Sequence, residues 1–133
     1  EKVDLITYRF TKAGVFDPTF GTGGVTRLDL AKEDDRARNV VSLADGRLLA
    51  VGSGKTTAAN VDAMIVLIKK DGGIESDFGT AGHVLSDLGG PADAWYGVSL
   101  SRDGKYVYVA GYKGVDAAAG GNDDAVLTRI TIG

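Results

Sequence analysis

The chain has 133 residues, of which 44% are hydrophobic and 25% charged, and its 15 basic and 18 acidic side chains leave a formal net charge of −3. This length suits one ordinary domain, and the charge balance gives no support to a nucleic-acid partner. Because cysteine is absent, disulfides, thiolate catalysis and cysteine-bound metals are excluded, and no apolar run approaches the roughly 20 residues of a membrane-spanning helix.

The predicted elements are short β-strands joined by glycine turns, as the 20 glycines and only 2 prolines indicate. Strands are predicted over residues 40–43, 47–52, 61–69 and 83–88. Asp45-Gly46 suits the two-residue hairpin turn between the first two, and β-branched and aromatic residues dominate the runs. A helix around residues 31–37 stays an open alternative, since no long stripe of 3.6-residue period is present.

The chain also repeats itself. Phe20-Gly21-Thr22 recurs 58 positions later as Phe78-Gly79-Thr80, and Asp45-Gly46 recurs as Asp103-Gly104. A third family of segments begins at Asp4, Asp62 and Asp124. The chain therefore divides into a single repeat domain, 1–133, with a partial repeat strand (1–14), repeat one (15–72) and repeat two (73–133). Four strands per repeat and one extra strand make nine.

The stretch "AVGSGKTT" at residues 50–57 resembles a phosphate-binding loop in its Gly-Lys-Thr segment. Such a loop needs a glycine where Leu49 stands and a helix after the lysine, and neither requirement is met. Its repeat counterpart, "VAGYKGV", has no Gly-Lys-Thr. We predict a turn with Lys55 as a solvated residue.

Two elements together carry a family resemblance: "ADGRLLAVG" with "RDGKYVYVAG", and "DFGTAGHV" with "DPTFGTGGV". The chain resembles the delta-60 repeat, a bacterial repeat of nearly this period from extracellular or surface proteins. The resemblance implies β-propeller-type blades, each a four-stranded sheet, and no established catalytic residues. The repetition and the lack of a catalytic constellation in the sequence predict a non-catalytic structural or interaction protein, and no cofactor and no membrane insertion are predicted.

Two blades and one strand cannot close a propeller, which needs typically 4–8 blades. Apolar pairs such as Val107/Val109 and Val66/Leu67 are expected to face water unless a neighbour covers them. We therefore expect completion by a homo-oligomer or by a larger partner protein, with strand addition as one route, because residues 4–10 and 124–130 are versions of one strand. A start at Glu1 predicts that a signal peptide has been removed, and thus an extracellular or periplasmic location.

Candidate sites are few. His83, the single histidine, is predicted to be exposed or at a strand edge, since one histidine without cysteine makes zinc improbable, and a hydrolase built on it with Ser86 or Ser99 has no support in spacing. The acidic segments "KEDD" and "GGNDD" offer oxygen ligands for Ca²⁺ without a known loop spacing. No metal site is predicted. Aspartates at recurring positions are expected instead to accept backbone N–H groups at turns. They are Asp35, Asp93, Asp4, Asp62 and Asp124.

Trp95 and Tyr96 replace Ala37 and Arg38 of the first repeat, so they are not repeat structure. With Tyr112 and the Gly/Ala loop after it, they are predicted to form a stacking surface for a glycan or a protein. The alternative is that Trp95 fills a gap between blades. All four phenylalanines are predicted to be core residues: Phe10, Phe16, Phe20 and Phe78.

Overall fold

The computed structural model describes residues 2–30, 33–55, 60–115 and 121–132. Within these ranges the chain is all-β: nine strands and no helix. The strands are β1 (Leu5–Tyr8), β2 (Val25–Leu28), β3 (Arg36–Ser42), β4 (Leu48–Gly54), β5 (Asp62–Ile68), β6 (His83–Ser86), β7 (Asp93–Leu100), β8 (Tyr106–Lys113) and β9 (Asp124–Thr131). The prediction of nine strands is confirmed for these residues.

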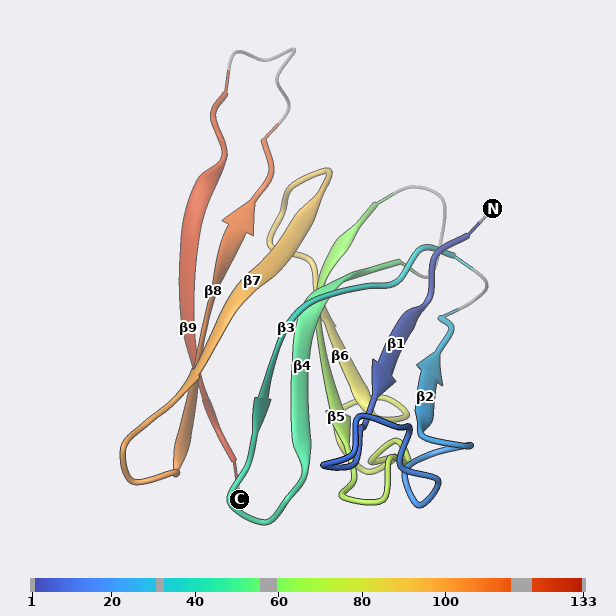
Figure 1. The fold of residues 1–133 in the computed structure, drawn as a ribbon. Coiled ribbons are helices and arrows are strands. Elements are labelled where there is room, and N and C mark those ends of the chain that lie inside the picture. Colours follow the sequence, from blue (N-terminus) through green and yellow to red (C-terminus); the bar gives the residue numbers. More distant parts are fainter. Residues whose placement is uncertain (1, 31–32, 56–59, 116–120, 133) are drawn as a thin grey trace.

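The strands form three antiparallel sheets in simple chain order (Figure 1). The first sheet is β1-β2, the middle sheet is β3-β4-β5-β6, and the third sheet is β7-β8-β9. Each sheet is a meander whose strands pair with their sequence neighbours, so hairpin turns such as Asp45-Gly46 set the register. No closed barrel or ring of blades is formed within the described ranges.

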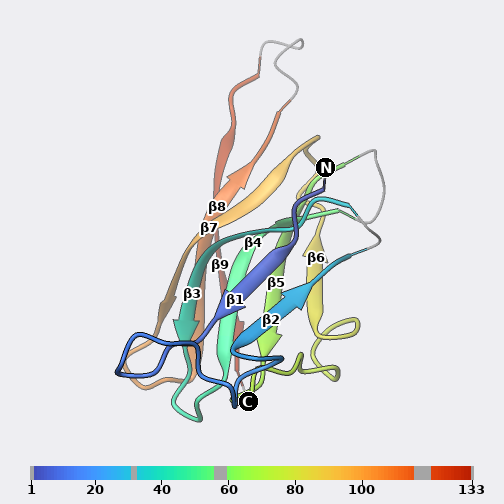
Figure 2. The ribbon, with the colours of Figure 1, turned by 45° about the vertical axis from the view of Figure 1, so that its right-hand side comes forward.

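The middle sheet lies between the other two, as both views show (Figures 1 and 2). Alternate residues of β4 and β5 point to opposite faces. One face packs on the third sheet through a cluster that includes Val51, Ile65 and Val109, and the other packs on the first sheet through a cluster that includes Met64 and Leu5. β4 and β5 are therefore buried on both faces, which explains their nearly continuous apolar sequence.

This stacking overturns one expectation. Val107, Val109, Val66 and Leu67, predicted to face water in a single chain, are all 3% exposed or less. Three sheets in one chain provide enough cover for the middle sheet, because the first sheet, which sequence reasoning treated as a leftover strand, is a two-stranded layer.

The phenylalanine prediction holds only in part. Phe20 is buried between the first and middle sheets, and Phe78 packs against the cluster between the middle and third sheets. Phe10 is 58% exposed and Phe16 is 49% exposed, so their assignment to the core is wrong. The two rings form a tilted pair, with centroids 5.0 Å apart, at the outside of the first sheet, where the described chain offers no further layer to cover them.

The two repeats share a fine structural detail. The β3–β4 register shifts between Ala37 and Asn39, and the β7–β8 register shifts at the equivalent place, between Trp95 and Gly97. Opposite each bulge stands a glycine. A Cβ at Gly52 would lie 1.8 Å from the Arg36 carbonyl oxygen, and one at Gly111 would lie 2.0 Å from that of Ala94. The recurring glycine therefore permits the close backbone approach at the bulge.

Sheet boundaries differ from repeat boundaries. Repeat one supplies β2 to the first sheet and β3–β5 to the middle sheet, while repeat two supplies β6 to the middle sheet and β7–β9 to the third. The first strand of each repeat thus completes the sheet that the preceding part of the chain begins. β3 begins at Arg36, four residues before the predicted strand, so the helix considered over 31–37 is not present in its described part, residues 33–37.

Candidate functional site

Two repeat-equivalent clusters of aspartates lie where one sheet passes into the next. The first triad is Asp4, Asp29 and Asp35, and the second triad is Asp62, Asp87 and Asp93. In each triad the carboxylate oxygens lie within 4.8 Å of one another. The first aspartate precedes β1 or begins β5, the second follows β2 or β6, and the third precedes β3 or begins β7, the first strand of the next sheet.

The third aspartate of each triad is fully buried and ties the crossover together. Asp35 Oδ2 accepts the backbone N–H of Leu30 at 2.6 Å, and Asp93 Oδ2 accepts that of Leu88 at 2.7 Å. Asp93 Oδ1 also accepts the N–H of Gly114 at 3.1 Å. The prediction that Asp35 and Asp93 accept backbone donors is confirmed, and these bonds anchor the loops between sheets.

The other recurring aspartates behave differently from the prediction. Asp4 forms an ion pair with Arg27. Asp62 Oδ1 is buried and has no hydrogen-bond partner. Asp124 is exposed, at the start of β9. Their shared role as acceptors of turn N–H groups is therefore not seen for Asp4 or for Asp62 Oδ1, because these atoms face other side chains rather than a turn.

Burial and mutual repulsion disfavour charge in both triads. Burial raises the pKa of Asp35 from 3.8 to about 6, the Leu30 N–H opposes the rise, and the negative charges of Asp29 and Asp4 add to it. Burial also raises the pKa of Asp62, with the charges of Asp87 and Asp93 adding to the effect. In each triad the fold thus holds carboxylates close together although their negative charges repel one another.

The predicted aromatic site is split by the structure. Trp95 is 2% exposed and belongs to the cluster between the middle and third sheets, so its assignment to a ligand-binding surface is corrected to the gap-filling alternative. Tyr96 and Tyr112 do come together, with ring centroids 5.6 Å apart, and the Arg38 guanidinium lies 5.1 Å from the centre of the Tyr96 ring. A surface hollow of about 470 Å³ lies beside the two tyrosines. The loop 116–120, part of the predicted surface, lies outside the described residues.

His83 begins β6, the edge strand of the middle sheet, which confirms the strand-edge prediction. Its Nδ1 is buried and has no hydrogen-bond partner, so no carboxylate orients the ring through that atom as a catalytic triad requires.

Lys55 follows the end of β4, and its Nζ lies 3.7 Å from Glu33 with 19% of the side chain exposed. It is thus half-buried and paired, not solvated. Residues 56–57 of the "AVGSGKTT" stretch lie outside the described ranges.

The two acidic segments considered for Ca²⁺ serve local contacts. Asp34, in "KEDD", accepts the Val3 N–H at 3.1 Å and contacts Arg36 at 3.3 Å. Asp123, in "GGNDD", accepts the Val115 N–H at 3.4 Å. Neither segment gathers its own carboxylates into a cluster among the described residues.

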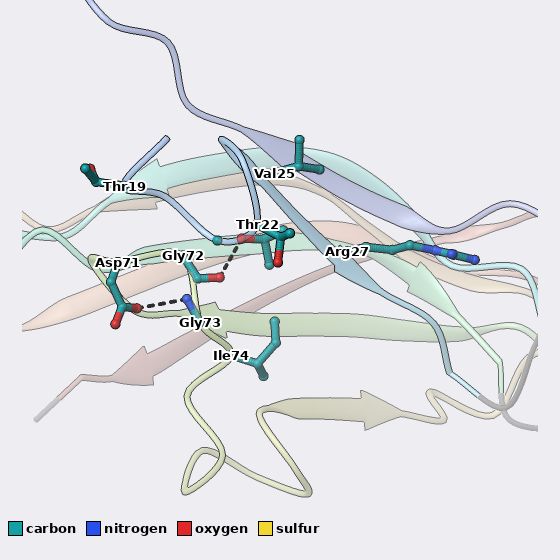
Figure 3. Close-up of a pocket in the computed structure, with 10 residues that line it drawn as sticks. Thr19, Thr22, Val25, Arg27, Asp71, Gly72, Gly73 and Ile74 are labelled. Carbon is teal, nitrogen blue, oxygen red and sulfur yellow. Dashed lines mark hydrogen bonds between the residues drawn. The ribbon is translucent and has the colours of Figure 1, made fainter. Parts of the chain in front are cut away.

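A hollow of about 570 Å³ lies at the seam between the first and middle sheets (Figure 3). Thr26 Oγ1 donates to the Gly72 carbonyl at 2.5 Å, and Gly73 N–H donates to Asp71 Oδ1 at 2.9 Å. Arg27 and Asp71 lie at opposite ends of the view in Figure 3. The Thr26 contact joins the first sheet to the turn after β5, and the Gly73 contact lies within that turn.

Sequence reasoning missed the triads because their members are widely separated in the chain. Asp29 and Asp87 stand at equivalent positions of the two repeats, as do Asp4 and Asp62, and Asp35 and Asp93. A search for acidic residues repeated at the 58-residue offset finds all three pairs. Their convergence in space depends on the sheet crossover, which the sequence pattern does not define.

Comparison with protein-family models, with curated proteins and with solved structures finds no match. The described residues contain no helix with the length and apolar character needed to cross a bilayer.

Proposed function

We propose that this chain is a non-catalytic structural subunit of stacked, propeller-type blades, which associates head to tail with further copies of itself. The delta-60 resemblance of the sequence supports this assignment. An extracellular or periplasmic location follows from the same resemblance and belongs to the proposal.

The observation that carries the proposal is the exposure of residues whose repeat equivalents are buried. Leu127 on β9 is 73% exposed, whereas its equivalent on β5, Ile65, is 4% exposed beneath the third sheet. Tyr108 is exposed too, while Leu49, which holds the same register position opposite β3 that Tyr108 holds opposite β7, is buried. The outer face of the third sheet thus corresponds to a face that is covered inside the molecule.

The opposite end of the stack has the same property. Ile6, Tyr8 and Phe10 are exposed on the outer face of the first sheet. Their equivalents on β5 are Met64, Val66 and Ile68, all fully buried beneath the first sheet. One copy's third sheet laid on the next copy's first sheet would therefore repeat the internal packing, a heterologous contact that makes rings or open stacks.

Light scattering after size exclusion, over a series of concentrations, tests the proposal. The wild type is expected to exceed the 13.8 kDa of one chain. Leu127→Glu and Tyr8→Glu each remove one face and are expected to lower the mass, and an equimolar mixture should restore a dimer through the two intact faces. Val40→Glu, at an exposed apolar residue of β3, is the matched control. A wild type that stays monomeric throughout contradicts self-association and leaves the larger partner protein as the remaining form of the proposal.

A second candidate is glycan binding at Tyr96 and Tyr112. The paired rings and the neighbouring Arg38 supply an apolar face and a donor, the combination that holds a sugar ring. Arg38 also covers part of the Tyr96 ring, which reduces the free stacking area. A glycan array with Tyr96→Ala, and with Tyr8→Ala as an exposed-tyrosine control, tests this candidate: binding lost only in Tyr96→Ala supports it, and no bound glycan in the wild type rules it out.

A further inference from the structure

We propose that the second triad binds a hard divalent cation, Ca²⁺ in preference to Mg²⁺, and that the first triad is a weaker copy of the same site. The proposal is independent of self-association. It rests on the placement of the carboxylates, on buried oxygens without a donor, and on the difference in local charge between the two copies.

The placement of the carboxylates is the first step. Three acidic side chains from separate parts of the repeat meet in space, and the same three positions meet in both repeats. Like charges at this distance destabilise the folded chain unless a cation lies between them. A single acidic cluster can be an accident of a charged surface, but its exact duplication at the sheet crossover ties it to the repeat itself.

The second step is a buried oxygen without a hydrogen bond in each triad. Asp35 is fully buried and its Oδ1 has no hydrogen-bond partner, although the Lys55 backbone N–H favours the ionised form of the carboxylate and lowers its pKa. In the second triad, Oδ1 of Asp62 is likewise buried and unpartnered. A buried carboxylate oxygen without a donor is rare in folded proteins, and a bound ion is one of the few things that satisfies it.

The ligand type selects the ion. All three side chains in each triad offer carboxylate oxygen and none offers histidine nitrogen, so hard cations are favoured over zinc or copper. The carboxylate oxygens of each triad lie within 4.8 Å of one another, close enough for one cation with Ca–O distances of roughly 2.4 Å to contact all three. Ca²⁺ accepts several carboxylates in a flexible geometry, whereas Mg²⁺ demands a near-ideal octahedron and keeps several of its waters.

The third step separates the two copies. In the first triad Arg27 pairs with Asp4 and lies 3.8 Å from Asp29, so a protein cation already offsets part of the charge. The position equivalent to Arg27 in the second repeat is Leu85. Among the described residues, no lysine, arginine or histidine forms an ion pair with any member of the second triad. The second triad therefore has the greater need for an external cation.

Terbium luminescence on the EDTA-treated full chain tests the proposal, with Tb³⁺ as the probe and Ca²⁺ or Mg²⁺ as competitor. Trp95, the single tryptophan, follows Asp93 by two positions, so its excitation sensitises an ion in the second triad. We expect a saturable signal that Ca²⁺ displaces with a Kd of about 10⁻⁴ to 10⁻³ M, the range of extracellular calcium-binding modules. Mg²⁺ is expected to displace it at higher concentration.

Variants assign the site. Asp87→Asn changes an exposed ligand and keeps the Oδ1 acceptor of the Gly89 N–H, and it is expected to weaken Ca²⁺ competition at least about tenfold. Asp124→Asn, at the repeat equivalent of Asp62 but in no triad among the described residues, is the matched control and is expected to change nothing. Asp62→Asn is the second variant. Ca²⁺ should also raise the melting temperature of the wild type but not of Asp87→Asn.

The proposal is overturned if no saturable signal forms, if Ca²⁺ does not compete, or if Asp87→Asn and Asp62→Asn bind as well as Asp124→Asn while circular dichroism shows all of them folded. If Asp62→Asn fails to fold, Asp87→Asn decides alone.

Discussion

The two aspartate triads have the same positions in the repeat, yet Arg27 lies beside the first triad where Leu85 takes its place beside the second. Arg27 lies on the exposed outer face of the first sheet, and its long side chain reaches Asp4. Its equivalent, Leu85, lies on the face of the middle sheet that the first sheet covers, and it packs against the core there. A cation is tolerated where the face is open to water, and an apolar residue is required where a sheet covers it. The stacking of sheets, and not the repeat, therefore decides which triad carries its own counter-charge.

The largest expected effect concerns pH and the first triad. Burial raises the pKa of Asp35 to about 6, so between about pH 4 and pH 6 the folded chain keeps a proton that the unfolded chain has released. Without divalent cations, the contribution of Asp35 to the free energy of unfolding is expected to fall by at most about 3 kcal/mol as the pH rises from 4 to 7. Urea unfolding of the wild type and of Asp35→Asn across this range, in EDTA, measures the contribution as the difference between the two curves. The difference is needed because hydrogen bonds lower the pKa of carboxyls such as Asp17 and Asp34, and these groups act in the opposite direction in both proteins. A difference that does not change between pH 4 and pH 7 contradicts the assignment.

The second prediction compares alanine with asparagine substitutions at the buried aspartates. Asp93→Ala removes the acceptor of the Leu88 N–H and one acceptor of the buried Gly114 N–H, which keeps its bond to the Ala92 carbonyl. The change is expected to cost about 2 kcal/mol in free energy of unfolding, because the half-buried Leu88 donor is left unpaired. Asp93→Asn keeps an oxygen in place and should cost less. The same pair of substitutions at Asp35 tests whether the crossovers of the two repeats are equally anchored. Equal losses for alanine and asparagine would show that the hydrogen bond is not what matters.

The substitution Arg27→Leu places beside the first triad the residue type that Leu85 provides beside the second. In EDTA the change is expected to alter the free energy of unfolding by no more than about 1 kcal/mol, since exposed ion pairs contribute little. In Ca²⁺ it is expected to create a second binding event of similar affinity to the first, measured by isothermal titration. If binding stays as in the wild type, Arg27 is not what separates the two triads.

The smallest effect is predicted at Asp124, the third member of the series Asp4, Asp62 and Asp124. Asp124 starts β9 and is exposed, so Asp124→Asn should change the free energy of unfolding by less than about 0.5 kcal/mol in EDTA or in Ca²⁺. A clear loss of stability in Ca²⁺ alone would indicate that Asp124 takes part in a cation site of its own.

Much of the fold could be predicted from local signals. The hairpin at Asp45-Gly46, the alternation in β8 and the recurring Phe-Gly-Thr segments gave the strand content and the repeat, because turn chemistry and period-two patterning are short-range. The exposure of Phe10 and the burial of Trp95 could not be predicted, since both depend on whether another sheet lies over the residue. Aromatic residues suit either place, so their sequence context carried no signal.

The sequence by itself determined an all-β chain of nine short strands, two repeats offset by 58 residues, and the recurrence of Asp35 and Asp93 as acceptors of backbone N–H groups. Only the tertiary structure decided that the first strand and its partner form a separate layer, that the middle sheet is covered on both faces, and that three distant aspartates meet at each crossover. The reason is physical: turns and strand periodicity are encoded by neighbours in the chain, whereas stacking and charge clustering arise between residues that only the fold brings together.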